Sequence, residues 1–173
     1  MMNSKTNVIG IDSVLDLTKA AVVAALYIVL TMVFAAVSYG PVQFRFSEGL
    51  NNLVPFNKRY IIAITVACFI TNITSPNGAI DMLVGTFETL INLVTIYLVT
   101  KHMNSLVLKL VASVLIGTFY MFIIGFEIAI IAHSAFWPTF WGTYLTAGIG
   151  EFVTMAIGAI VLYLINAKYD LSK

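Results

Sequence analysis

The stretch Tyr39-Gly40-Pro41-Val42-Gln43-Phe44-Arg45-Phe46-Ser47-Glu48-Gly49-Leu50 interrupts a chain that otherwise consists of one apolar segment after another. It combines an arginine, a glutamate and a glutamine with a Gly-Pro turn, close to where a membrane-spanning segment is expected to begin. Charged side chains at such a position are costly in hydrocarbon, so they usually face a cavity, a partner or water. The interpretation of the whole chain depends on which of these applies.

The composition is that of an integral membrane protein. Of the 173 residues, 60% are hydrophobic and only 10% are charged, whereas a soluble domain carries about 25% charged residues. The net charge of +1 says nothing about partners, and no nucleic-acid partner is expected for a chain of this class. The single cysteine, Cys68, excludes a disulfide framework within the chain. The first apolar run is about 19 residues long, which is too long for a signal-peptide core, so we expect a retained helix.

Six apolar segments predict an all-α integral membrane protein with six transmembrane helices, in a single domain over residues 1–173. Residues 1–18 form the expected N-terminal segment, in which Ser13 and Asp16 have the spacing of a helix cap. The second and third spans are short, at about 20 Å for the second, against a hydrocarbon core of about 30 Å. The predicted spans are Lys19–Ser38, Gln43–Pro55, Tyr60–Ile73, Ile80–Thr100, Ser105–Ala132 and Thr139–Ala167.

The basic residues predict the orientation in the membrane. Six spans bring both termini to the same side, and all but one of the nine basic residues fall on that side. Under the positive-inside rule the termini are therefore expected in the cytoplasm, and Arg45 is the exception. The eight residues in agreement are Lys5, Lys19, Lys58, Arg59, Lys101, Lys109, Lys168 and Lys173.

The acidic residues have the opposite distribution. Helices too short to cross fully leave loops in the outer leaflet, and irregular backbone at that depth survives only around a protein-lined or water-filled cavity. We therefore expect an acidic cavity that opens outward, with residues 39–50 and 74–80 at its rim. The carboxylates expected in the outer half or near the membrane centre are Glu48, Asp81, Glu88, Glu127 and Glu151.

Two predicted helices each carry polar residues at helical spacing along one face. Intramembrane acids without an evident partner are candidates for function, so Glu127 or Glu151 is expected to bind a ligand. A structural hydrogen-bond network is the alternative, and Asn72 serves equally well as a ligand contact or a helix cap. The face of the fourth helix holds Asp81, Gly85, Glu88 and Asn92, and that of the sixth holds Tyr144, Gly148, Glu151, Met155 and Gly158.

Aromatic residues gather around the turn expected at 133–138. They fit an aromatic belt at the membrane interface, and the alternative is a flat ligand that stacks on Trp137 or Phe140. At the cytoplasmic end of the first helix, small residues allow another helix to pack closely, either within the bundle or from a second subunit. This small-residue ladder consists of Ala20, Ala21, Ala24 and Ala25.

Catalytic and cofactor motifs are missing from the sequence. There is no His-x-x-x-His or cysteine pair for zinc, no nucleophile elbow and no phosphate-binding loop. A binding or transport subunit without a cofactor is therefore favoured over an enzyme, and partner subunits are expected to supply any ATP hydrolysis. An integral membrane enzyme or a structural subunit of another complex is the alternative class.

With these features the chain resembles the QueT family of substrate-binding (S) components of energy-coupling factor (ECF) transporters, associated with uptake of queuosine precursors. The resemblance implies the six-helix S-component fold, cytoplasmic termini, a bacterial cell membrane and a ligand that enters from outside. It also implies a transmembrane coupling (T) subunit, docked on the alanines of the first helix, and two ATPase subunits. The residues that carry it are Tyr39–Glu48 with Pro55, Asp81–Thr86, Thr89–Leu90, Gly125–Glu127 and Gly150–Val153.

The implied ligand is a 7-deazaguanine, in its 7-aminomethyl form, and another vitamin such as thiamine is the alternative. Carboxylates would accept hydrogen bonds from its N–H edge, and an aromatic face would stack on its base. We expect Arg45 and Glu48, three residues apart, to pair and to structure the loop. The expected ligand contacts are Glu127 and Glu151 for the N–H edge, Glu88 or Asp81 for the amine, Trp137 or Phe140 for stacking, and Gln43, Phe44, Asn72 and Asn92.

Overall fold

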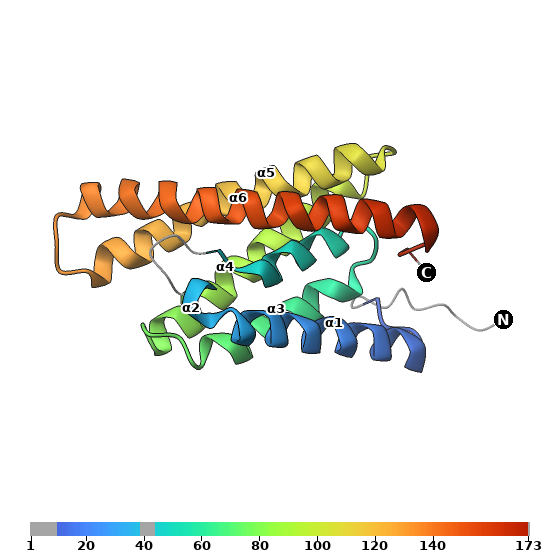
Figure 1. The fold of residues 1–173 in the computed structure, drawn as a ribbon, viewed down its shortest axis with the longest axis horizontal. Helices are drawn as coiled ribbons and strands as arrows, with labels where there is room; N and C mark the ends of the chain where they lie inside the picture. Colours follow the sequence, from blue (N-terminus) through green and yellow to red (C-terminus); the bar gives the residue numbers. More distant parts are fainter. Residues whose placement is uncertain (1–9, 39–43, 173) are drawn as a thin grey trace.

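A computed structural model describes residues 10–38 and 44–172, which form a lengthwise bundle of helices (Figure 1). The predicted boundaries of the third, fourth and fifth helices hold to within one residue at each end. The described residues contain no strand. In chain order the elements are α1 (Val14–Val33), α2 (Ala35–Ser38), the 3-10 helix η1 (Phe46–Leu53), α3 (Arg59–Asn72), α4 (Ala79–Thr100), α5 (Leu106–Ile131) and α6 (Phe136–Lys168).

Four of the described helices, α1, α4, α5 and α6, are long and apolar enough to cross a membrane. Helix α3, with 14 residues, is about 21 Å long. The prediction of an α-helical span over Gln43–Pro55 is wrong in its helix type, because the described part forms η1, a 3-10 helix of eight residues. Its Ser47, Glu48, Asn51 and Asn52 are buried. This segment therefore places polar side chains inside the bundle.

Helix η1 lies inside the bundle and packs chiefly against α6 and α1 (Figure 1). Its backbone touches that of α6, because a Cβ atom on Gly158 would lie 2.4 Å from the Cα of Gly49. Asn52 Nδ2 fixes the crossing by donating to the Met155 carbonyl at 2.9 Å. The close approach expected at Gly158 is therefore present, whereas a Cβ on Gly148 would meet Thr118 only at 3.9 Å.

The first turn of α1 is capped as the sequence predicts. Ser13 Oγ accepts a hydrogen bond from the Asp16 backbone N–H at 3.1 Å and donates to Asp16 Oδ2 at 2.8 Å. Asp16 also forms an ion pair with Arg59, whose side chain is only 1% exposed. Arg59 is thus a buried structural residue that joins the start of α1 to the start of α3.

The start of α1 and the end of α6 lie at the same end of the bundle (Figure 1). Helix α6 begins at Phe136, three residues before the predicted start, because proline is tolerated in the first turn of a helix. With 33 residues it is about 50 Å long. The α5–α6 hairpin extends beyond the other helices at the end opposite to the termini (Figure 1).

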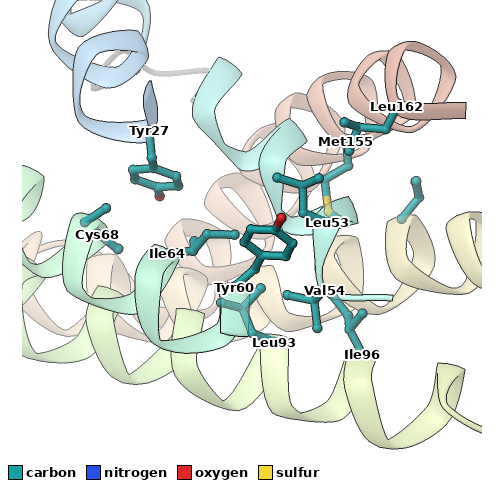
Figure 2. Packing of buried hydrophobic residues seen from close by; sticks show 12 residues of the cluster. Tyr27, Leu53, Val54, Tyr60, Ile64, Cys68, Leu93, Ile96, Met155 and Leu162 are labelled. Carbon is teal, nitrogen blue, oxygen red and sulfur yellow. The ribbon is translucent and has the colours of Figure 1, made fainter. Parts of the chain in front are cut away.

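The apolar core surrounds the C-terminal end of η1, at Leu53 (Figure 2). Leu53 belongs to one cluster with fully buried side chains from four surrounding helices, namely Tyr27 of α1, Ile64 of α3, Leu93 of α4 and Met155 of α6. The core therefore forms around an interior segment, and the long helices enclose it.

We expect Gly158→Ala to destabilise the protein by about 1–3 kcal/mol, because its methyl group would overlap the backbone of η1. Gly142→Ala, in the same helix, is the matched control, since a Cβ there meets nothing within 4 Å. Thermal unfolding of both purified variants in the same detergent measures the effect. Equal unfolding midpoints for the two variants would contradict the crossing.

Candidate functional site

A cavity lies where η1, α3, α4, α5 and α6 meet. It is near the C-terminal ends of α3 and α5 and the N-terminal half of α4, toward the end of the bundle opposite to the termini (Figure 1). Its walls stand close together, so the centre of a water molecule can move within only about 20 Å³. The lining residues are Arg45, Glu48, Asn72, Asp81, Gly85, Glu88, Met121, Ile124, Glu127 and Glu151.

Helical spacing explains why these side chains converge. On α4, Asp81, Gly85 and Glu88 follow at intervals of four and three residues and so share one face. On α5 the same rule aligns Met121, Ile124 and Glu127. The five carboxylates that the sequence predicts on the outer side all line this one cavity.

Glu48 is held by several hydrogen-bond donors. Tyr27 Oη donates to its Oε1 at 2.5 Å, and Asn51 Nδ2 donates to its Oε2 at 2.6 Å. Arg45 Nη1 lies 3.5 Å from Oε1, which is the pair expected from their spacing. Thr31 Oγ1 and Ser47 Oγ, 2.7 Å apart, make a second link between α1 and η1. The negative charge of Glu48 is therefore stabilised inside the bundle.

Asp81 and Asn72 close the side of the cavity near the α3–α4 turn. Asp81 accepts hydrogen bonds from Ser75 Oγ and, at 3.1 Å, from Asn77 Nδ2. Asn72 Nδ2 donates to the Asp81 carbonyl at 3.2 Å. A Cβ on Gly85 would lie 2.7 Å from Asn72 Nδ2, so Gly85 leaves the space that this amide occupies.

The remaining three carboxylates are buried with oxygens that receive no hydrogen bond from any described residue. Glu88, Glu127 and Glu151 are 4%, 4% and 2% exposed. The oxygens without a donor are Glu88 Oε1, Glu151 Oε1 and both carboxylate oxygens of Glu127. A buried acceptor without a partner costs about 1–3 kcal/mol. These oxygens are therefore available to a ligand that donates hydrogen bonds.

Three predicted contacts, Asn92, Trp137 and Phe140, lie elsewhere. Asn92 is buried one turn below Glu88 and does not line the cavity. Trp137 is 61% exposed, and Phe140 packs in an aromatic cluster, 4.6 Å from the Phe126 ring centre. Phe140 and Glu151 are eleven residues apart on α6, about 16 Å along its axis.

The aromatic faces expected for stacking are therefore absent from the described lining, and Phe44 does not line it either. Gln43 lies outside the described residues. The apolar surface of the cavity comes instead from Met121 and Ile124, which the sequence analysis missed. The signal that could have identified them is their position six and three residues before Glu127, which places them on the same face of α5. Tyr27 was missed as well, although it stands seven residues after Ala20 on the inner face of α1.

The sequence model of the QueT transporter family matches residues 17–167. The chain belongs to this family. It is 38% identical over 169 residues to a protein of Lactococcus lactis subsp. cremoris (strain MG1363) named "Queuosine precursor transporter QueT". The match covers 91% of this chain and 96% of that protein. No solved structure matches the chain.

Membership of this family makes the chain a transporter component rather than an enzyme. Together with its apolar helices, it identifies a multi-pass protein of the bacterial cell membrane. Within the described residues, no group of three or more His, Cys, Asp or Glu side chains is arranged to hold a metal ion. The acceptor-rich cavity is the candidate substrate-binding site.

We expect Tyr27→Phe to lower the stability by about 1–3 kcal/mol, because Glu48 loses a buried donor. Tyr163→Phe, at a side chain that is 45% exposed, is the matched control. Thermal unfolding of the two variants in detergent measures the difference. If Tyr27→Phe unfolds at the same temperature as the control, the hydrogen bond to Glu48 does not support the fold.

Proposed function

We propose that this chain is the substrate-capture (S) component of an ECF uptake transporter and binds a 7-deazaguanine, in its 7-aminomethyl form, from outside the cell. The observation that carries the proposal is a buried cavity in which Glu88, Glu127 and Glu151 offer acceptor oxygens without donors. Such a cavity favours a ligand rich in N–H donors with a positive charge. An aminomethyl deazaguanine has both properties.

The charge distribution supports six-span topology with cytoplasmic termini in a single membrane domain. Basic residues at the helix ends Lys58, Lys101 and Lys168 gather at the end of the bundle where α1 starts and α6 stops (Figure 1). The positive-inside rule assigns this end to the cytoplasm. The cavity then lies toward the outer surface, as uptake from outside requires.

The ligand contacts that we propose follow from the chemistry of the lining. Glu127 and Glu151 accept hydrogen bonds from the N–H edge of the base, and Glu88 or Asp81 receives the ammonium group. Met121 and Ile124 are the proposed contacts of the base plane, in place of Trp137 or Phe140, since a thioether packs favourably against aromatic rings. The walls must move apart to admit a bicyclic base, because the centre of a water molecule can move within only about 20 Å³ of the cavity.

We expect Glu151→Gln to weaken binding of 7-aminomethyl-7-deazaguanine about 2- to 13-fold, because an amide NH2 replaces one acceptor oxygen and a hydrogen bond contributes about 0.5–1.5 kcal/mol. Asp12→Asn, at an exposed position outside the bundle, is the control. Isothermal titration calorimetry on the purified proteins measures both affinities. An unchanged affinity in Glu151→Gln would contradict the role of Glu151, and no binding by the wild-type protein would contradict the ligand.

The docking of a coupling subunit is proposed on the outer face of α1. Ala21 and Ala25 are exposed, whereas Ala20 is buried and Ala24 is half-buried against the bundle. Two exposed alanines four residues apart leave a shallow surface on which another helix can pack closely. The proposed complex contains the T subunit and two ATPases, which hydrolyse ATP.

We expect Ala21→Trp and Ala25→Trp to abolish co-purification with the coupling subunit and the ATPases, because an indole fills the shallow surface. The ligand affinity should stay unchanged, since both side chains point away from the cavity. Val29→Trp, exposed one turn farther along α1, is a control of equal bulk. Complexes that survive both alanine changes would exclude this docking face.

A further inference from the structure

The carboxylates of the cavity fall into two groups by their hydrogen bonds. Glu48 and Asp81 each accept from at least two side-chain donors. Glu88, Glu127 and Glu151, which we call the orphan trio, each have at least one buried oxygen without a donor among the described residues. Among the described residues, the side-chain donor to Glu88 is Thr89 Oγ1, at 3.4 Å from Oε2. The two groups therefore differ in how well a negative charge is supported.

The cavity cannot hold all five carboxylates in ionised form. Among the residues that line it, Arg45 is the sole cation, and its guanidinium lies beside Glu48. Five ionised carboxylates would leave four negative charges uncompensated. Burying even one unpaired charge costs several kcal/mol, and like charges that share one site disfavour each other's ionisation. A proton on a carboxyl group removes the charge and turns an orphan oxygen into a donor.

We propose that the orphan trio holds protons and that the cavity takes up an organic cation in exchange for them. The exchange is balanced: the ligand enters as R–NH3⁺, one glutamic acid of the trio gives its O–H proton to water, and an ammonium–carboxylate pair remains. No bond of the ligand breaks and no electrons are transferred. This inference rests on the proposed function, because it assumes that the ligand is a cation.

Other charged or titratable groups near the cavity define the setting of the exchange. Glu48 and Asp81 already accept hydrogen bonds from several side-chain donors, so the proposed exchange does not include them. Tyr27 and Cys68 do not line the cavity but lie next to residues near it. Tyr27 donates a hydrogen bond to Glu48, and the Cys68 thiol lies beside the Thr89 hydroxyl group. By element these groups are Tyr27 of α1, Arg45 and Glu48 at η1, Cys68 of α3, Asp81 and Glu88 of α4, Glu127 of α5 and Glu151 of α6.

The exchange predicts that affinity rises with pH. Raising the pH removes protons from the trio before the ligand arrives, so the ligand has fewer protons to displace and binds more tightly. A binding step that releases one proton gains up to about tenfold in affinity for each pH unit. The neutral 7-cyano analogue, which lacks the ammonium group, should release fewer protons and show a weaker pH dependence.

Two measurements on the purified full-length protein test the inference. Infrared spectroscopy at neutral pH, without ligand, should detect the C=O band of protonated carboxyl groups, reduced in Glu88→Gln and in Glu151→Gln. Asp12→Asn is the control and should leave the band unchanged, because Asp12 is exposed and lies outside the bundle. Calorimetry with 7-aminomethyl-7-deazaguanine, in buffers of equal pH but different ionisation enthalpy, should give a slope of about one released proton.

The outcomes separate the inference from the proposed function. Absence of the protonated-acid band, or a slope of zero while the amine binds, overturns proton exchange and leaves the proposed ligand intact. A band that keeps its full strength in Glu88→Gln and in Glu151→Gln overturns the assignment to these two acids. A wild-type protein that does not bind the amine refutes the proposed ligand, and the infrared band then decides by itself whether the trio carries protons.

Discussion

The backbone contact between η1 and α6 is the constraint on which the rest of the structure depends. Gly49 and Gly158 bring the two elements together without intervening side chains, and Asn52 bonds across the crossing to α6. Because η1 is held there, its Glu48 faces the carboxylates of α4, α5 and α6 rather than lipid. A larger residue at either glycine would push η1 toward α1 and change the width of the cavity.

Much of the architecture could be predicted from the sequence because the long helices carry strong local signals. Apolar runs bounded by turns predicted α3, α4 and α5 to within one residue at each end, and Ser13 with Asp16 predicted the cap of α1. Helix η1 could not be recognised as a 3-10 helix, because its conformation is set by tertiary hydrogen bonds to α1 and α6. Burial of Arg59 was equally hidden, since it depends on a partner 43 residues away.

The residues of the candidate site likewise divide into those with a clear signal in the sequence and those without one. Carboxylates in an apolar chain are conspicuous, so all five that line the cavity could be identified before the fold was known. Its apolar surface could not, because Met121 and Ile124 resemble any other lipid-facing or core residues in sequence. The aromatic residues Trp137 and Phe140 are equally conspicuous in the sequence, but the length of α6 separates them from Glu151, and no local signal shows this separation. Family membership supports substrate transport.

Helix α1 has two sides that are one helix diameter, about 10 Å, apart. One carries Tyr27 and Thr31, which bond to Glu48 and Ser47 of η1, and the other carries Ala21 and Ala25. Two hydrogen bonds one helical turn apart couple the rotation of α1 to the position of η1. If α1 rotates about its own axis, it must carry η1 along or break both bonds. On this side of the protein, α1 is thus the single helix between the exposed surface and η1. A movement of α1 therefore acts directly on η1, which carries Glu48 of the cavity.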